Sequence, residues 1–300
     1  MSRDRLKQIA FALAALIFLW GSVEILRGGF DEVTGDFTIP VVAQADADSV
    51  VFERAADTVV LAKQGEEWTV NGHRAAASGV SDFFGLLETA PRGQLIAQSI
   101  DTHGRLAIDD STARVFRIFG NGDTLAHMLV GKRAPGFQDS YFRHSGEAAV
   151  YSVRTRIATY VDRNVDDWRD RSIVQIDTSV VSSAEVVLGG QSYLLRRDGD
   201  AWQMPDGQAP DSAVMVNLLR EYTSLSATGF RGSDDDPFDF DRPDRRAVLR
   251  DAAGDVLLEL AFDSILSGFW VRKTGDSAVY RLSNFTVNRM TPSDSTLRGN

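Results

Sequence analysis

The sequence predicts an α+β protein, in which an N-terminal transmembrane helix precedes two tandem repeats of a mostly antiparallel sheet with one packed helix. Three observations lead to this fold class: an apolar run near the N-terminus, an internal duplication, and one amphipathic stripe of helical period in each copy. Each repeat is expected to follow the order β-β-α-β-β-β-β. The expected parts are a cytoplasmic N-terminus at 1–8, a transmembrane anchor at 9–26, a stalk at 27–48, the first repeat at 49–161, a connector at 162–184, the second repeat at 185–290 and a frayed tail at 291–300.

The predicted anchor is an apolar run that contains a single charge, Glu24. A spanning helix needs about 20 mostly apolar residues, so residues 9–26 form a short but adequate span. Arg3, Arg5 and Lys7 precede the run, and positive flanking charge stays in the cytoplasm. The sequence therefore places the N-terminus inside and the body outside.

A cleaved signal peptide is the alternative interpretation of this run. Ala43-Gln44-Ala45 has the A-x-A pattern of a cleavage site, and cleavage there would leave Asp46 at the new N-terminus. The pattern lies well beyond the apolar core, with several charged residues between them. We therefore favour the anchor.

The internal duplication is clearest in a predicted β-hairpin that occurs in both copies. Residues 59–68 match residues 193–202, and both segments place a turn glycine and an acid before a tryptophan, Trp68 or Trp202. Dipeptides such as Asp-Gly are typical of two-residue hairpin turns. Each tryptophan should open the return strand.

A short amphipathic helix follows the hairpin in each copy. Its apolar residues recur at positions i, i+3, i+4 and i+7, which predicts one face packed on the sheet. Ser78 or Ser81 in the first copy and Asp211 in the second are candidate N-caps. The two apolar stripes are Val80, Phe83, Phe84 and Leu87, and Met215, Leu218, Leu219 and Tyr222.

Two further matched segments complete each copy. Residues 115–130 match residues 247–262 as a second hairpin, and residues 141–151 match residues 270–280 with the same aromatic, arginine, glycine and Ala-Val-Tyr pattern. Most of these shared residues are ones that a sheet and its helix need. The duplication therefore explains the fold and leaves function to surfaces that differ between the copies.

The composition excludes several functional classes. The chain has 42 acidic and 32 basic side chains and a net charge of -10, which would repel a polyphosphate backbone, so we expect no nucleic-acid partner. It has no cysteine, which excludes disulfides, thiolate metal sites and a cysteine nucleophile.

The sequence offers no catalytic, cofactor-binding or metal-binding residue, and we expect a protein that is not an enzyme and needs no cofactor. The histidines lack metal-ligand spacing, and no nucleotide-binding or hydrolase motif occurs. The acidic segment Asp234 to Asp241 could hold calcium, but it lacks the EF-hand glycine and glutamate, so a solvated loop is favoured. The four histidines are His73, His103, His127 and His144.

The recurring aromatic residues admit two interpretations. Trp68 and Trp202, like Tyr151 and Tyr280, occupy matched positions among apolar strand residues, which favours a role in the core. Exposed aromatic side chains would instead stack on sugars or peptides. The matched Arg143 and Arg272 are explained by solvent exposure or by pairing with an acid.

The order of these segments resembles the bacterial domain-of-unknown-function 4340 family (DUF4340). His103-Gly104-Arg105-Leu106 stands where the family pattern has Tyr or Phe, then Gly-Leu. The resemblance implies an envelope protein with an N-terminal anchor, auxiliary to ABC-type export systems of the gliding-motility kind, and it assigns no catalytic residues. The segments that carry it are Trp68, Leu86-Leu87, residues 129–132, residues 141–143, residues 149–151 and Trp168-Arg169-Asp170-Arg171.

Taken with the resemblance, the sequence favours a non-enzymatic accessory or scaffold protein of the bacterial inner membrane, with a periplasmic body. Its expected partners are the membrane, through one span, and other envelope proteins, among them an ABC-type transporter. The alternative is a periplasmic module that binds glycan or peptide in the cleft between the repeats. A third hypothesis, a hydrolase with unrecognised carboxylates, requires an acidic pocket with shifted pKa values.

Overall fold

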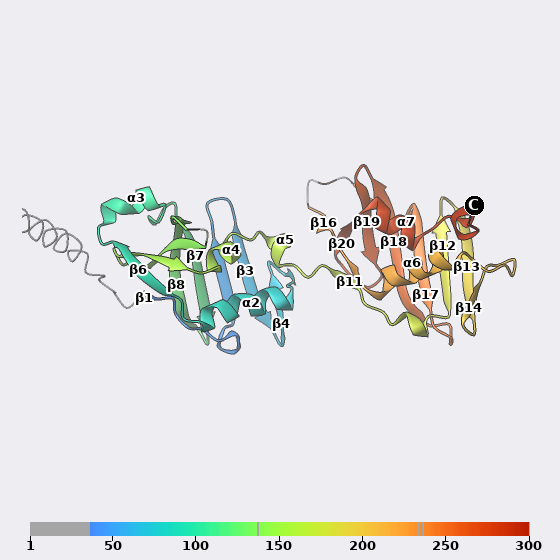
Figure 1. Cartoon of the computed structure of the whole chain (residues 1–300), viewed down its shortest axis with the longest axis horizontal. Helices are drawn as coiled ribbons and strands as arrows, with labels where there is room; N and C mark the ends of the chain where they lie inside the picture. The colour runs from blue at the N-terminus through green and yellow to red at the C-terminus, as the bar shows by residue number, and fades with distance from the viewer. Residues whose placement is uncertain (1–36, 137, 233–234, 236, 300) are drawn as a thin grey trace, which may run out of the picture. The chain divides into compact units, whose positions relative to one another are not determined.

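The computed structural model describes residues 37–136, 138–232, 235 and 237–299. The chain divides into two compact units at the boundary between Arg169 and Asp170, and each unit is described by itself (Figure 1). Strand pairing among the described residues is antiparallel throughout. The expected antiparallel sheets are therefore present.

The first unit contains a ten-stranded sheet in the order β1-β6-β10-β9-β8-β7-β2-β3-β4-β5. Its strands are β1 (Phe37–Thr38), β2 (Ser49–Glu53), β3 (Thr58–Gln64), β4 (Glu67–Val70), β5 (His73–Arg74), β6 (Arg92–Ala97), β7 (Arg114–Gly120), β8 (Asp123–Arg133), β9 (Asp139–His144) and β10 (Val150–Arg154). Its helices are η1 (Gln44–Asp46), α2 (Ala77–Glu88), η2 (Ile100–Thr102), α3 (His103–Leu106), α4 (Ile157–Val161) and α5 (Val165–Trp168).

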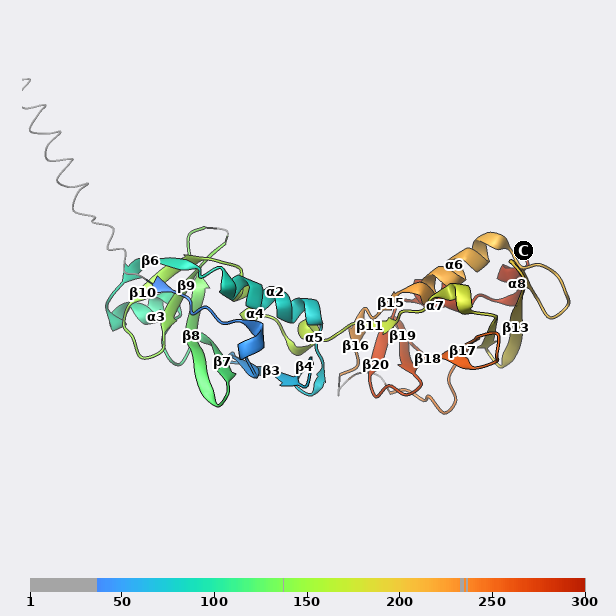
Figure 2. The same ribbon diagram turned by 90° about the horizontal axis from the view of Figure 1, so that it is seen from below.

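The core of the first unit lies between one face of its sheet and helices α2 and α4 (Figure 2). All four predicted stripe residues of α2 are buried. Phe83 from this stripe meets Phe52 of β2 edge to face at 5.3 Å between ring centres, and Phe52 in turn stacks on Trp168 at 5.4 Å. The connector residue Trp168 is therefore part of this core.

The second unit contains an eight-stranded sheet in the order β14-β13-β12-β17-β18-β19-β20-β16 and a separate pair, β11-β15. Its strands are β11 (Ser172–Val174), β12 (Ser183–Leu188), β13 (Gln191–Asp198), β14 (Ala201–Gln203), β15 (Leu225–Ser226), β16 (Gly229–Phe230), β17 (Arg245–Arg250), β18 (Val256–Ile265), β19 (Gly268–Lys273) and β20 (Val279–Leu282). Its helices are η3 (Thr178–Val180), α6 (Ser212–Thr223), α7 (Asn284–Met290) and α8 (Asp294–Leu297).

The two large sheets share one strand order. Starting from the edge, the first runs β4-β3-β2-β7-β8-β9-β10-β6 and the second runs β14-β13-β12-β17-β18-β19-β20-β16. The first sheet adds β5 beyond β4 and β1 beyond β6. The matched segments of the sequence thus occupy equivalent strands.

The similarity extends beyond the matched sequence segments, to the last short helix of each unit. The N–H of Ala76 donates to the carbonyl of Trp168 at 2.7 Å, and the N–H of Asp211 donates to the carbonyl of Leu297 at 2.7 Å. These bonds join the start of α2 to the end of α5, and the start of α6 to the end of α8. Residues 291–299, expected as a frayed tail, therefore contain a helix with the fully buried Leu297.

The fold class predicted from the sequence, with its N-terminal transmembrane helix, is corrected by the structure. No helix in the described residues is long and apolar enough to cross a membrane. The predicted anchor itself, residues 9–26, lies outside the described residues, as do the residues before it and the first part of the predicted stalk.

The predicted order β-β-α-β-β-β-β is also wrong for both units. In the first unit two strands, β5 and β6, flank α2, and β1 pairs with β6 at the far edge. Each unit also has additional helices that pack beside its long one. Strands of two residues and helices of four carry too little periodicity to be read from a sequence.

The helix starts show which caps the sequence could identify. Asp211 caps α6, and its carboxylate accepts the N–H groups of Ala213 and Val214, as predicted. Neither Ser78 nor Ser81 caps α2, because both lie within the helix and no side-chain bond caps its start.

Candidate functional site

The histidines do not form a site. No three His, Asp or Glu side chains in the described part of the chain are grouped so that they could hold a metal ion. His73 is exposed on β5. The ring of His103 is buried, with Nε2 2.8 Å from the carbonyl oxygen of Ala148, and the His144 ring lies 4.9 Å from that of Phe37.

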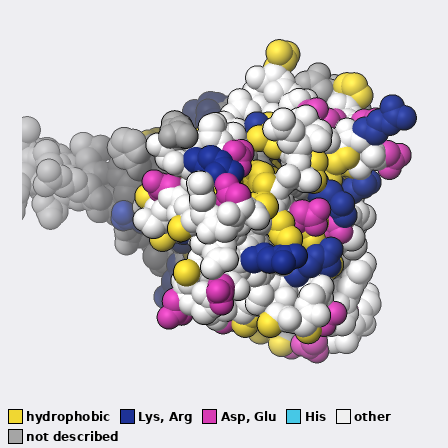
Figure 3. Space-filling view, turned by 90° about the vertical axis from the view of Figure 1, so that its right-hand side faces the viewer, with side chains coloured by type: hydrophobic (Ala, Val, Ile, Leu, Met, Phe, Trp, Pro, Cys, Tyr) yellow, Lys and Arg dark blue, Asp and Glu magenta, His cyan; other side chains and the backbone are white. Residues whose placement is uncertain are grey.

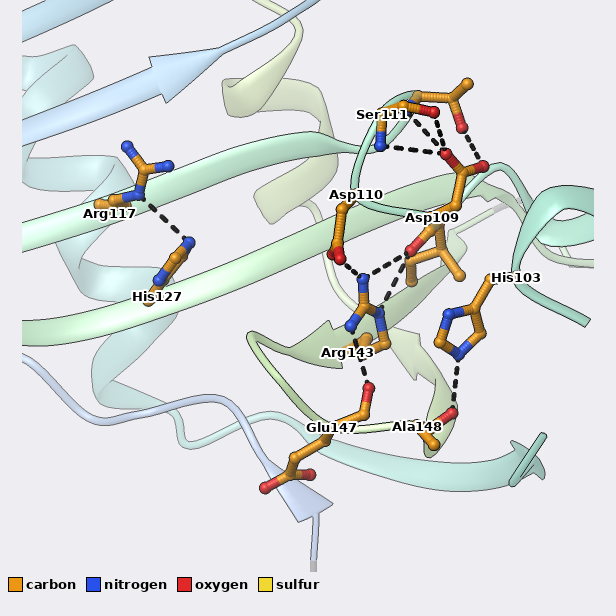
Figure 4. Close-up of polar contacts among 11 residues, drawn as sticks. His103, Asp109, Asp110, Ser111, Arg117, His127, Arg143, Glu147 and Ala148 are labelled. Carbon is orange, nitrogen blue, oxygen red and sulfur yellow. Dashed lines mark hydrogen bonds and ion pairs between the residues drawn. The ribbon is translucent and has the colours of Figure 1, made fainter. Parts of the chain in front are cut away.

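His127 is held as a neutral hydrogen-bond acceptor. Arg117, its partner across β7 and β8, donates from Nε to His127 Nε2 at 3.1 Å (Figure 4). It also pairs through Nη1 with Glu53 at 2.5 Å. Burial lowers the pKa of His127, the charge of Arg117 lowers it further, and Glu53 opposes the shift. The bond orders the sheet surface, and it occupies the Nε2 lone pair with which His127 would otherwise accept a proton.

Arg143 is the centre of a structural network beneath α3. Its guanidinium donates to the carbonyl of Ile108 at 3.2 and 3.1 Å, to the carbonyl of Glu147 at 2.9 Å and to Asp110 at 2.5 Å (Figure 4). The Arg143 side chain is only 4% exposed, whereas that of Asp110 is 87% exposed. Arg143 thus fastens the segment after α3 to the outer face of the sheet.

The carboxylate next to this network belongs to a turn. Asp109 accepts hydrogen bonds from the hydroxyl and the N–H of both Ser111 and Thr112. The Ser111 hydroxyl contributes most to lowering the pKa of Asp109. A general acid needs a raised pKa, so this carboxylate is unsuited to that role.

The matched Arg272 has a different environment in the second unit. Its guanidinium lies 4.7 Å from the centre of the Phe240 ring. Phe240 belongs to the acidic segment Asp234 to Asp241. In that segment the N–H of Asp239 donates to Asp263, and Asp239 in turn accepts from the N–H of Asp241. Residues 234 and 236 lie outside the described residues, so the calcium interpretation stays a prediction.

The strongest candidate site is an apolar groove of about 580 Å³ in the second unit, which we call the α6 groove. It is formed by η3, the β13–β14 hairpin, the segment that precedes α6, and one face of α6. Val216 of α6 is 62% exposed there. The lining residues are Asp177, Thr178, Ser179, Arg197, Asp200, Ala201, Trp202, Ala209, Pro210, Ser212, Met215, Val216 and Leu219.

One residue explains why the sheet edge beside this groove is open. In the first unit the N–H of Ala75 donates to the carbonyl of Trp68 at 2.9 Å, and β5 continues the pairing along β4. The matched position in the second unit is Pro210, which has no N–H to donate. No described N–H donates to the carbonyl of Trp202, and β14 is the edge strand.

The side chains at the matched positions cover the tryptophan in the first unit but leave it partly exposed in the second. Trp68 is 5% exposed and its ring lies 5.6 Å from that of Phe84. In the second unit Leu219 takes the place of Phe84, and both Trp202 and Leu219 are only half-buried. The core role predicted for the matched aromatics thus holds for Trp68 but only partly for Trp202.

The matched tyrosines differ in burial as well. Tyr280 is buried in the core of the second unit. Tyr151 is half-buried and stacks on Phe37 of β1, with 4.3 Å between ring centres. Neither tyrosine lines the α6 groove.

The rim of the α6 groove is more acidic than basic. Arg197 is already occupied, because it donates to the carbonyls of Ser179 and Gly199 at 2.8 and 3.1 Å. Asp200 is fully exposed with its carboxylate 3.9 Å from Arg197, and hydrogen bonds from Ser179 lower the pKa of Asp177. On one face of the second unit, hydrophobic side chains lie between basic and acidic ones (Figure 3).

The chemistry of the α6 groove favours binding over catalysis. Its lining includes serine and threonine hydroxyls but no histidine or lysine that could activate them. Its one shifted carboxylate has a lowered pKa. An apolar floor with a few charged groups at the rim is typical of a site that holds a ligand or a partner segment.

Comparison with protein families identifies the chain. A model described as "Domain of unknown function (DUF4340)" matches residues 68–243, more than half of the sequence. The chain belongs to the DUF4340 family. Neither the curated proteins nor the solved structures gave a significant match. The resemblance seen in the sequence is thus confirmed, and the family assigns no activity to this DUF4340 protein.

The sequence contained a signal for the α6 groove that the duplication concealed. Matching Trp202 with Trp68 implied that both were buried in the same way. Two differences between the copies carry this signal: Pro210 stands where the first copy has Ala75, and Leu219 stands where it has Phe84. A proline beside a predicted edge strand and a smaller side chain on the facing helix together predict an open edge.

Proposed function

We propose that this DUF4340 protein is a non-enzymatic accessory or scaffold protein, and that it holds a partner protein by an apolar segment seated in the α6 groove. The observation that carries the proposal is the open edge at Trp202, next to a groove of about 580 Å³. The first unit closes the equivalent edge with its own β5, so the opening is specific to the second unit.

The expected partner segment is extended, apolar at its centre and basic at its ends. A large apolar side chain would cover Val216 and Leu219, and aromatic anchors commonly carry most of the binding energy of such interfaces. The unpaired carbonyl of Trp202 can accept a main-chain N–H from an extended chain. Lys or Arg next to the anchor would face Asp177 and Asp200.

The partner class that we propose is an ABC-type transport system of the cell envelope. Its basis is the family resemblance together with a site that has no catalytic machinery. We propose accordingly that the body of the protein lies in the periplasm.

Site-directed photo-crosslinking in the native host tests this function. A photoreactive residue at Val216 should crosslink to one partner, whereas the same residue at the exposed matched position Ser81 of the first unit should not. Leu219→Asp places a charge on the groove floor and should abolish the Val216 product. Mass spectrometry of the product tests the partner class, because a transporter subunit is expected.

Purified components then give the strength of the contact. Trp202→Ala should weaken binding of the captured segment by roughly 30-fold, the effect of losing a contact worth about 2 kcal/mol. Equal crosslinking from Val216 and Ser81, or a product that survives Leu219→Asp, would contradict the proposal.

A further inference from the structure

Several basic side chains that have no described partner lie together at one end of the first unit. Six basic side chains on or next to β6, α3, β8 and β10 form no hydrogen bond or ion pair with any described residue. These elements lie together at one end of the unit in both views (Figures 1 and 2). The six are Arg92, Arg105, Lys132, Arg133, Arg154 and Arg156.

The strand register brings three of these six residues onto neighbouring strands. Arg133 of β8 is paired with Ser140 of β9, and Ser140 is paired with Val153 of β10. Val153 is in turn paired with Gly93 of β6. Arg154 and Arg92, which are next to Val153 and Gly93 in the chain, therefore lie within the same end of the sheet as Arg133.

A hollow of about 470 Å³ lies within this group, and we call it the cationic pocket. Arg105, Lys132 and Arg133 surround it, and Ile96, Leu106 and Tyr141 supply apolar surface. A second, polar hollow of about 220 Å³ includes Arg133 as well. The exposed Arg133 thus lines both the cationic pocket and the polar hollow.

We propose that the cationic pocket binds the phosphate headgroups of anionic phospholipids at a membrane surface. Three unpaired cations around an apolar floor match a ligand with a charged head and an apolar chain. Ile96 and Ile100 are 45% and 70% exposed, and aliphatic side chains among basic ones favour the boundary between headgroups and acyl chains.

The same surface is poorly suited to nucleic acid, the other common polyanion. Single strands bind through exposed aromatic rings on which the bases stack. The aromatic side chain at the cationic pocket, Tyr141, is buried, and its ring is not available for stacking. This proposal rests on the first unit alone and is independent of the α6 groove.

Vesicle binding by the full chain tests the inference with two matched double variants. Lys132→Gln with Arg133→Gln removes two cations of the patch. Lys63→Gln with Arg196→Gln removes two cations that likewise form no side-chain bond with a described residue but lie on β3 and β13. The mostly apolar residues 9–26 are the same in every variant and can themselves bind vesicles. The test therefore compares the affinities of the variants with each other.

We expect wild type to bind phosphatidylglycerol vesicles more tightly than phosphatidylcholine vesicles. The Lys132/Arg133 variant should lose roughly 30-fold of its affinity for phosphatidylglycerol, since each surface cation is worth about a factor of five. The control variant should bind within about twofold of wild type. Hydrogen exchange should slow in residues 94–106 when phosphatidylglycerol vesicles are added.

Three results would overturn the inference. The first is equal affinity for the two lipids, and the second is an equal loss in both double variants. The third is protection of residues 94–106 by inorganic phosphate or by single-stranded DNA that equals the protection by phosphatidylglycerol, since either would show a general anion site.

Discussion

Replacing Arg143 by methionine removes both of its roles, as the partner of Asp110 and as the donor to two main-chain carbonyls, and comparison with a change at Asp110 separates them. Methionine keeps much of the side-chain volume but donates no hydrogen bond. The carbonyls of Ile108 and Glu147 would each lose a donor. Ile108 is fully buried whereas Glu147 is exposed, so the Ile108 carbonyl dominates the cost. A buried polar group without its partner costs about 1–3 kcal/mol, and we expect Arg143→Met to lower the free energy of unfolding of the first unit by about that amount.

Asp110→Asn is the matched control. The Asp110 side chain is 87% exposed, and exposed ion pairs contribute about 0–1 kcal/mol. Because the two units have separate cores, urea unfolding is best followed by pulsed hydrogen exchange of peptides from β9 and from β19, the second acting as an internal standard. If Asp110→Asn destabilises β9 as much as Arg143→Met does, the carbonyl bonds are not the main contribution and the reasoning fails.

Three further variants test local features of the first unit. Gly120→Ala should destabilise it by at least about 2 kcal/mol in urea unfolding, because an added Cβ would lie 2.0 Å from the Asp46 carbonyl oxygen. Gly85→Ala, inside α2 with nothing within 4 Å, should instead stabilise by about 0.5–1 kcal/mol, and destabilisation would refute its open surroundings. Burial lowers the pKa of His127 below 6.5, so the unfolded chain binds more protons and stability falls as the pH drops through this value. His127→Gln should reduce that dependence in melts at pH 7 and below, and an unchanged profile would contradict it.

Local periodic features of the fold could be predicted from the sequence. The turns at Gly65 and Gly199 both have positive φ, as two-residue hairpin turns require. The apolar stripes mark the buried faces of α2 and α6, with Leu219 as the half-buried exception. These features depend on residues that are close in the chain, where spacing alone carries the signal.

Long-range features could not be predicted in this way. The strand β6 pairs with β1 and β10, and its sequence, RGQLIA, shows no clean alternation of apolar and polar residues. Trp168 and Leu297 occupy equivalent positions, yet the two side chains differ too much to be matched from sequence. Equivalence of this kind becomes visible only through the main-chain bonds that the residues make.

The candidate site was hidden by a similar effect. Repeats draw attention to what two copies share, whereas the α6 groove results from differences at Pro210 and Leu219. The duplication predicts that function resides on surfaces that differ between the copies, without naming residues, and this stays a prediction. The hydrogen bonding at Trp202 shows one such difference.

The difference between Ala75 and Pro210 also bears on how duplicated domains diverge. The codons for alanine and proline differ at a single base, so one point mutation is enough to remove the N–H that closes the sheet edge. Each unit keeps its own core, so such a change in one copy leaves the packing of the other intact. Gene duplication can therefore open a sheet edge in one mutational step while the sister copy retains the closed form.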